Sequence, residues 1–408
     1  MGSLDRHQRT VLLLASMLAI AAAKSFIQSC NSASQCSSLV AYRTPAAQSL
    51  GAIAALFNID TVSLLAANNL DLRSSLDPGS PQLVIAPRRI VKVPISCSCV
   101  DGIWRGNATL YKSRPGDTLA SIADALFGKL VTAKQIAQAN GIAANFGGAV
   151  AAGSTLVIPF SCGCGDSLAG GGTALLMSYV VQGGDTVGEL AREYGSLPGD
   201  FMALNGVANA SELAAGDVVA VPIRACGSSF RRSAYDFGLV VANGSYIITA
   251  GHCVQCSCLP NLQQVYCTPA PGVISGSCPD MRCLGTNLTV GAMATAASVQ
   301  GCNVTSCLYT GFKKKIILSS LQSVNLNSCP APPPPPSYKS AAGSLALPPA
   351  AAPGSSGLTT PGVTIPASGN SAFAPGPSTA AAAGTFSQIR FGSLSLVSLL
   401  LLLVVLMI

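Results

Sequence analysis

The residues best suited to chemistry in this 408-residue chain are its sixteen cysteines. Two C-x-C pairs, Cys97-Ser98-Cys99 and Cys162-Gly163-Cys164, stand in the first half, Cys30 and Cys36 precede them, and ten more cysteines lie between Cys226 and Cys329. An even number of cysteines with only two histidines favours disulfides in an oxidising compartment over a zinc site. The two members of a C-x-C pair cannot comfortably bond each other. We therefore expect them to tie distant segments together.

Catalytic chemistry has weaker candidates. The run IITAGHCVQC around His252 resembles the histidine strand of chymotrypsin-like serine proteases, but no Gly-Asp-Ser-Gly loop follows it. A glycan hydrolase would need two carboxylates across a cleft, and Asp236 and Asp280 are candidates only because they are acidic. Their segment is rich in cysteine and too short for a barrel. We expect a protein that is not an enzyme and has no cofactor, with His252 in a structural role beside Cys253.

The composition favours small modules and argues against nucleic-acid binding. Only 10% of the residues are charged, while Gly and Pro number 41 and 26. The net charge of +7 is modest, and its longest basic run is Lys313 to Lys315.

The elements that must position these cysteines form a repeat through the first half of the chain. Three segments, 42–96, 110–160 and 178–224, begin near a tyrosine and follow the order strand, helix, helix, strand, which predicts an α+β fold. Their first helices carry apolar residues at helical spacing, and their second helices end at Asn68-Asn69, Asn140-Gly141 and Asn205-Gly206. The closing strands are predicted at QLVIAP, STLVIP and DVVAVP. Units of about 45 residues bury little core, so we expect disulfides to stabilise them.

Two of these segments resemble a known module. The strings YKSRPGDTLASIADALFG and YVVQGGDTVGELAREYG resemble LysM modules, with a Tyr strand, a Gly-Asp-Thr turn and an apolar helix. The first segment, YRTPAAQSLGAIAALFNID, has Pro45-Ala46-Ala47-Gln48 in place of that turn and is similar to a divergent copy. Three such modules with C-x-C spacers resemble the plant LysM-domain GPI-anchored receptor proteins. That resemblance implies the disulfides Cys30 to Cys99, Cys36 to Cys164 and Cys97 to Cys162.

The resemblance also implies a glycan site. In LysM modules a sugar lies in a shallow groove between the loop after the first strand and the loop after the second helix. Glycines there expose backbone groups that can pair with an acetamide, and small apolar side chains can shelter its methyl group. The candidate residues in the second module are Pro115, Gly116, Asp117, Thr118, Asn140, Gly141, Ile142, Ala143, Ala144 and Asn145, and those in the third are Gly184, Asp185 and Thr186. A glycan on Asn209 would crowd the third groove, so the second module is the expected principal site.

The remaining half divides into a cysteine-rich domain and a stalk. Residues 225–329 carry scattered strand signals and predict a small β domain, in which Cys226, Cys253, Cys258 and Cys283 are expected to form disulfides whose pairing the spacing leaves open. Residues 330–384 are dominated by Pro, Ala, Ser and Gly, which predicts a disordered stalk.

Both ends of the sequence have the pattern of processing signals. Basic residues, an apolar run and Ala21 to Ala23 predict a signal peptide over 1–23, followed by an N-terminal cysteine segment over 24–41. Small residues around Ala382, the expected attachment point, precede a spacer and an apolar tail, which predicts a GPI signal over 385–408. An ordinary single-pass anchor is the alternative. Five sequons, at Asn107, Asn209, Asn243, Asn287 and Asn303, agree with export.

These features predict a cell-surface receptor or co-receptor on the outer face of the plasma membrane. The family resemblance implies binding of N-acetylglucosamine polymers, either chitin or peptidoglycan, in innate immune signalling, with a LysM receptor kinase as partner. The sequence allows both homo-oligomers and hetero-oligomers. The alternatives are a wall-adhesion protein and a hydrolase that uses LysM modules for targeting.

Overall fold

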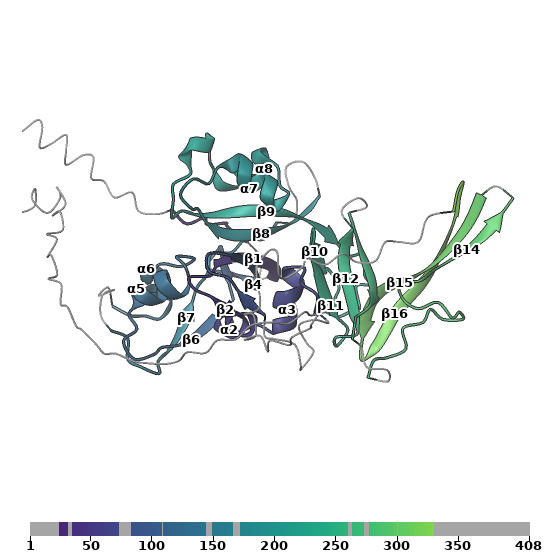
Figure 1. Ribbon diagram of the computed structural model, residues 1–408, viewed down its shortest axis with the longest axis horizontal. Coiled ribbons are helices and arrows are strands. Elements are labelled where there is room, and N and C mark those ends of the chain that lie inside the picture. Colours follow the sequence, from purple (N-terminus) through teal and green to yellow (C-terminus); the bar gives the residue numbers. More distant parts are fainter. Residues whose placement is uncertain are drawn as a thin grey trace, which may run out of the picture. The chain divides into compact units, whose positions relative to one another are not determined.

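The structure is a computed structural model that describes residues 24–31, 35–72, 83–107, 109–143, 149–165, 172–259, 263–272, 277–299 and 301–329 (Figure 1). The expected signal peptide, stalk and GPI signal, including Ala382, lie outside these residues. The predicted α+β fold, with three modules of strands and helices followed by a cysteine-rich β domain, is confirmed.

The first module is built around a long antiparallel pair, β1 (Gln35–Arg43) with β4 (Ile90–Val100). Between them lie β2 (Gln48–Ser49), α2 (Leu50–Leu56), α3 (Thr61–Ala67) and β3 (Val84–Ile85). Our predicted closing strand, QLVIAP, is wrong: only Val84–Ile85 of it is a strand, and it pairs with β2. The closing strand begins at Ile90, because the Asn68 side chain at the end of α3 hydrogen-bonds the backbone N–H and C=O of Lys92.

The second and third modules follow the predicted order. The second contains β6 (Thr109–Lys112), α5 (Leu119–Ser121), the π-helix η1 (Ile122–Leu126), α6 (Ala133–Ala139) and β7 (Thr155–Ile158), with β5 (Ile103–Gly106) in the spacer before it. The third contains β8 (Thr173–Val180), α7 (Val187–Tyr194), α8 (Pro198–Asn205), the 3₁₀-helix η2 (Ala210–Glu212) and β9 (Val218–Gly227). Its helices α7 and α8 lie over one face of the β8–β9 pair (Figure 1).

The modules bury their apolar faces against one another. Phe57 of the first module and Phe127 of the second stack edge to face with ring centroids 5.7 Å apart, and Phe160 lies 5.5 Å from each. Trp104 of the spacer packs against this core. The third module joins the first through β1, which pairs with β8 in parallel at Leu39. Each small unit therefore gains core from its neighbours.

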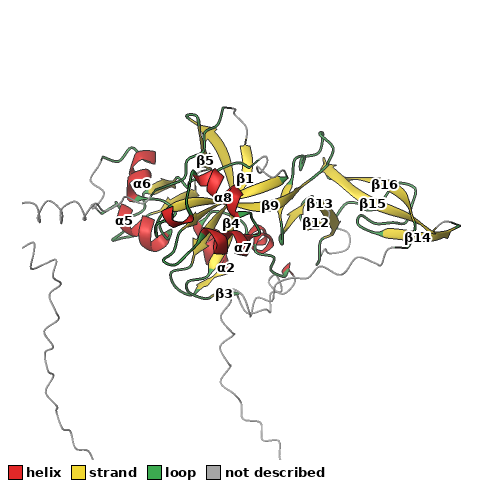
Figure 2. Ribbon diagram, turned by 90° about the horizontal axis from the view of Figure 1, so that it is seen from above, coloured by secondary structure: helices red, strands yellow, loops and turns green. Residues whose placement is uncertain are grey.

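The described part of the cysteine-rich domain consists of strands and loops, with no helix (Figure 2). The strands are β10 (Val240–Ala242), β11 (Tyr246–Thr249), β12 (Val254–Leu259), β13 (Gln264–Pro269), β14 (Met293–Ser298), β15 (Gly301–Lys313) and β16 (Ile316–Leu326). The loop before β10 packs directly on Gly311 of β15, where a Cβ would lie 2.3 Å from the Ala234 Cβ. Only glycine fits there, since its φ is also +114°.

Disulfides join all sixteen cysteines. The pairs in the modules are Cys30–Cys99, Cys36–Cys164 and Cys97–Cys162, the three that the family resemblance implies. Those in the β domain, whose partners the spacing left open, are Cys226–Cys258, Cys253–Cys278, Cys256–Cys267, Cys283–Cys307 and Cys302–Cys329. The sulfurs of Cys36, Cys97 and Cys164 lie within 4.8 Å of one another, but disulfide sulfur lacks the thiolate charge that binds zinc.

In the described ranges, no single helix is long and apolar enough to cross a bilayer; α2 and α3 pass that test only as a pair, and they are bent by 107°.

Candidate functional site

The Gly-Asp-Thr turn of the second module is held by Asp117. Its Oδ2 accepts hydrogen bonds from the Tyr111 hydroxyl at 2.8 Å and from the Arg114 N–H at 2.7 Å. Burial, followed by this contact with Asp117, raises the pKa of Tyr111 to about 12. Asp117, which we expected to contact the glycan, therefore fixes the shape of its own loop.

Thr118 continues this loop into the helix and joins it to the second loop. Its hydroxyl accepts a hydrogen bond from the Ser121 N–H at 3.0 Å, and the Ser121 hydroxyl accepts one from the Thr118 N–H. This reciprocal pair is a capping box. Thr118 also forms a β-bridge with Ala149, and the Val150 N–H donates to the Asp117 carbonyl at 2.8 Å. The two loops expected to flank a groove are therefore neighbours.

Asn140 fixes the other side of the groove. Its amide nitrogen donates to the carbonyls of Ile136 and Val157, and its Oδ1 accepts from the Val157 N–H at 2.8 Å. Three of its four hydrogen-bonding positions are thus used inside the module. Its side chain thus ties the end of α6 to β7, and Asn140 also lines the hollow described below, so the glycan contact expected there stays a prediction.

The groove presents backbone and small apolar groups to solvent. Pro115, Gly116, Gly141, Ile142 and Ala143 are exposed, and both glycines have positive φ, of +86° and +62°. A hollow of about 410 Å³ lies beside them. Its lining is Leu119, Asn140, Ile142, Ala149, Val150, Ala151, Ser154, Thr155 and Leu156. Ala144 and Asn145, the other two candidates, lie outside the described residues.

The third module repeats this geometry. Asp185 accepts from the Tyr179 hydroxyl and the Gln182 N–H, each at 2.7 Å, and Thr186 accepts from the Glu189 N–H at 3.2 Å. Burial and Asp185 raise the pKa of Tyr179 far above its usual value. Gly184 is exposed with φ +95°, and Asn209, the sequon asparagine expected to crowd this groove, is exposed in the segment after α8.

The first module keeps the same frame with different residues. The Tyr42 hydroxyl donates to Gln48 Oε1 at 3.2 Å, and Ser49 caps α2 by accepting from the Ala52 N–H. Gln48 and Ser49 thus replace the Asp and Thr of the other modules. Sequence reasoning missed this equivalence, although Gln48 stands six residues after its tyrosine, as Asp117 and Asp185 do after theirs.

The acidic residues considered for hydrolysis have other partners. Asp236 accepts from the hydroxyls of Thr249 and Tyr309 and from the Phe312 N–H, which anchors its loop to β15. Asp280 forms an exposed ion pair with Arg282 at 2.9 Å, and this neighbour lowers the pKa of the Asp280 carboxyl. His252 stands in the exposed turn between β11 and β12 with φ +69°. Across the described chain, no hydrogen bond links His252 to Asp236.

Comparison with known proteins follows the same division of the chain. The LysM domain family matches residues 47–81, 111–159 and 179–222. LysM domain-containing GPI-anchored protein 1 of Arabidopsis thaliana is 39% identical over 79% of this chain and 76% of its own length. LysM domain-containing GPI-anchored protein LYP6 of Oryza sativa subsp. japonica is 40% identical over 90% of each chain. The rice chitin elicitor-binding protein is 29% identical over 76% of this chain and 84% of its own.

Proposed function

The chain belongs to the family of plant LysM domain-containing GPI-anchored proteins, and we propose that it is a cell-surface receptor or co-receptor that binds N-acetylglucosamine-containing glycans without cleaving them. The single observation that carries this proposal is the pair of loops in the second module, joined at Thr118 and Ala149, which expose glycine backbone beside a hollow lined by Ile142. Such a surface suits an uncharged N-acetylated sugar.

The site favours binding over catalysis because its one carboxylate has a structural task. Asp117 already accepts two hydrogen bonds, so it is poorly placed to act as the acid or base of glycan hydrolysis. The name of the rice relative, chitin elicitor-binding protein, supports chitin oligomers as a ligand. Peptidoglycan presents the same sugar, and the binding assay below distinguishes the two polymers.

The names of the relatives support attachment by a GPI lipid. A lipid in the outer leaflet leaves no protein on the cytoplasmic side, so signalling requires a partner that spans the membrane. A LysM receptor kinase fits this requirement, with the glycan shared between the two ectodomains.

The test is retention of the ectodomain, residues 24 to 380, on insoluble chitin and on peptidoglycan, with cellulose as the control polymer. Ile142→Asp places a charge in the hollow and should weaken retention about ten-fold, since one exposed isoleucine contributes on the order of 1.5 kcal/mol when a ligand covers it. Leu197→Asp is the matched control, because Leu197 is an apolar residue in the third module that is somewhat more exposed, 46% against 37% for Ile142.

Retention on chitin or peptidoglycan that Ile142→Asp reduces and Leu197→Asp preserves would support the second-module site and name the polymer. Equal retention of both variants would refute that site. Glycan-dependent co-precipitation with a LysM receptor kinase ectodomain would then separate a receptor from an adhesion protein, which would hold the glycan and recruit no kinase.

A further inference from the structure

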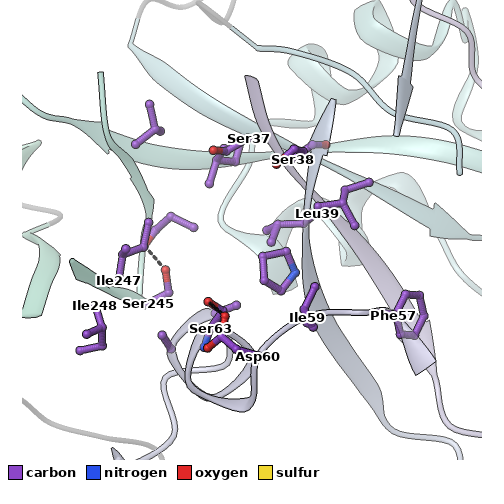
Figure 3. Close-up of a pocket in the computed structure, with 18 of the residues that line it drawn as sticks. Ser37, Ser38, Leu39, Phe57, Ile59, Asp60, Ser63, Ser245, Ile247 and Ile248 are labelled. Atoms are coloured by element: carbon purple, nitrogen blue, oxygen red, sulfur yellow. Dashed lines mark hydrogen bonds between the residues drawn. The ribbon is translucent and has the colours of Figure 1, made fainter. Parts of the chain in front are cut away.

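A cavity of about 490 Å³ lies between the first LysM module and the cysteine-rich domain, apart from the groove of the second module. Figure 3 shows Asp60 and Ser63 on the first turn of α3, with Ile247 and Ile248 of β11 across from them. The residues from Ser37 to Leu39 of β1 close a third side.

The walls of this cavity are fixed by a buried contact. Tyr246, the first residue of β11, is 1% exposed, and its hydroxyl donates to the Leu70 carbonyl at 2.6 Å. This bond links the cysteine-rich domain to the segment directly after α3. Asp60 is fixed as well, because it accepts hydrogen bonds from both the N–H and the hydroxyl of Ser63. The cavity is therefore a built feature with a defined polar edge.

Asn107 also lines this cavity, and it is the first residue of a glycosylation sequon that ends at Thr109. The Asn107 side chain is exposed and oriented by a hydrogen bond from the Ser98 hydroxyl to its Oδ1, while its backbone N–H donates to Ser96. An N-glycan is attached through the amide nitrogen, so both of these bonds persist in the glycosylated protein. The attached sugar therefore starts at the cavity.

We propose that the chain's own N-glycan on Asn107 occupies this cavity and holds the first module against the cysteine-rich domain. The first sugars of an N-glycan are N-acetylglucosamine, whose apolar ring face and acetamide methyl suit Ile59, Ile247 and Ile248. Its hydroxyls can donate to Asp60 and exchange hydrogen bonds with the hydroxyls of Ser37 and Ser63. Covalent attachment replaces the affinity that a free sugar would need, because the tether keeps the effective concentration high.

This inference is independent of the glycan-binding function. It concerns a sugar carried by the protein, in a cavity formed by other residues than the second-module groove. Absence of chitin or peptidoglycan binding would not contradict a glycan in this cavity, and an empty cavity would not contradict the proposed glycan-binding function.

The test uses the full chain expressed in plant cells, with site-by-site release of glycans by a peptide N-glycosidase followed by peptide mass spectrometry. A glycan docked in nine molecules out of ten should be released about ten-fold more slowly from Asn107 in the native protein than after denaturation. The reference sites are Asn209, Asn287 and Asn303, which are exposed and do not line the cavity. They should lose their glycans at similar rates in both states.

Two substitutions make the test specific for the cavity. Ser63→Trp and Ser37→Trp each fill it from a different wall, and both should raise native release at Asn107 to the rate of the reference sites. Ala120→Trp adds the same bulk to an exposed position on α5 and should leave Asn107 protected. An unglycosylated Asn107, native release as fast as at the reference sites, or protection that survives both cavity-filling variants would overturn the proposal.

Discussion

Replacing Asn140 should loosen the second module by an amount that the structure allows to be estimated. Asn140→Ala removes two donated bonds, to Ile136 and Val157, and one accepted bond, from Val157. Each such bond contributes about 1 kcal/mol net. Water can reach part of half-buried Val157 and of the helix end, so we expect a loss of about 2 kcal/mol. This corresponds to a roughly thirty-fold increase in local opening.

The assay is amide hydrogen exchange of peptides from β6 and β7, because disulfides to neighbouring segments make local opening more informative than global unfolding. Asn140→Asp should be at least as disruptive as Asn140→Ala. It keeps the acceptor but turns a carboxylate toward two carbonyls at a helix C-terminus, where negative charge is unfavourable. Gln138→Ala, on the exposed side of the same helix, is the control and should exchange like the unmodified protein. Unchanged exchange of β7 in Asn140→Ala would refute the role assigned to this side chain.

The remaining predictions concern a titration and two packing contacts. The pKa of Tyr111 is about 12 in the folded protein, against an ordinary value of 10.0. The protonated Tyr111 therefore stabilises the fold fully below pH 10, and this stabilisation is lost as the pH rises toward 12. In a tyrosinate absorbance titration, Asp117→Asn should move this loss to lower pH. Gly311→Ala should lower the melting temperature sharply or prevent folding. Gly244 also has positive φ, but a Cβ there would meet no atom within 4 Å, so Gly244→Ala should cost only about 1 kcal/mol of stability. Equal effects of the two substitutions would contradict the close packing at β15. Tyr246→Phe should cost about 1 kcal/mol in thermal unfolding, and an unchanged melting temperature would show that its hydroxyl contributes nothing across the two domains.

Local patterns were enough to predict the modules. A tyrosine followed by an Asp-Thr turn, apolar helix positions and asparagine stops each depend on neighbours within one turn or strand, so sequence spacing carries them. The stops show this directly, because Asn69, Gly141 and Gly206 all have positive φ, between 55° and 62°.

The errors arose where distant residues decide the outcome. Two apolar stretches follow α3, and the second becomes the closing strand because it pairs with β1 and because the Asn68 amide bonds to Lys92. Sequence spacing also could not show that the Asp117 and Asn140 side chains hydrogen-bond within the module. Their contact with a glycan stays a prediction. The cavity at Asn107 could not be predicted at all, since its walls come from segments as far apart in the chain as Ser37 and Ile248.

The disulfides of the cysteine-rich domain also give it a mechanical character. A pull on the chain beyond Cys329 passes to Cys302, and then through Cys307, Cys283, Cys278, Cys253 and Cys258 to Cys226. Along that route the backbone is used only in the short stretches 302–307, 278–283 and 253–258. Three such stretches extend to roughly 50 Å, whereas the uninterrupted backbone from Cys226 to Cys329 would extend to roughly 350 Å. The domain therefore extends little under load, and a force applied beyond Cys329 reaches the LysM modules without first unfolding it.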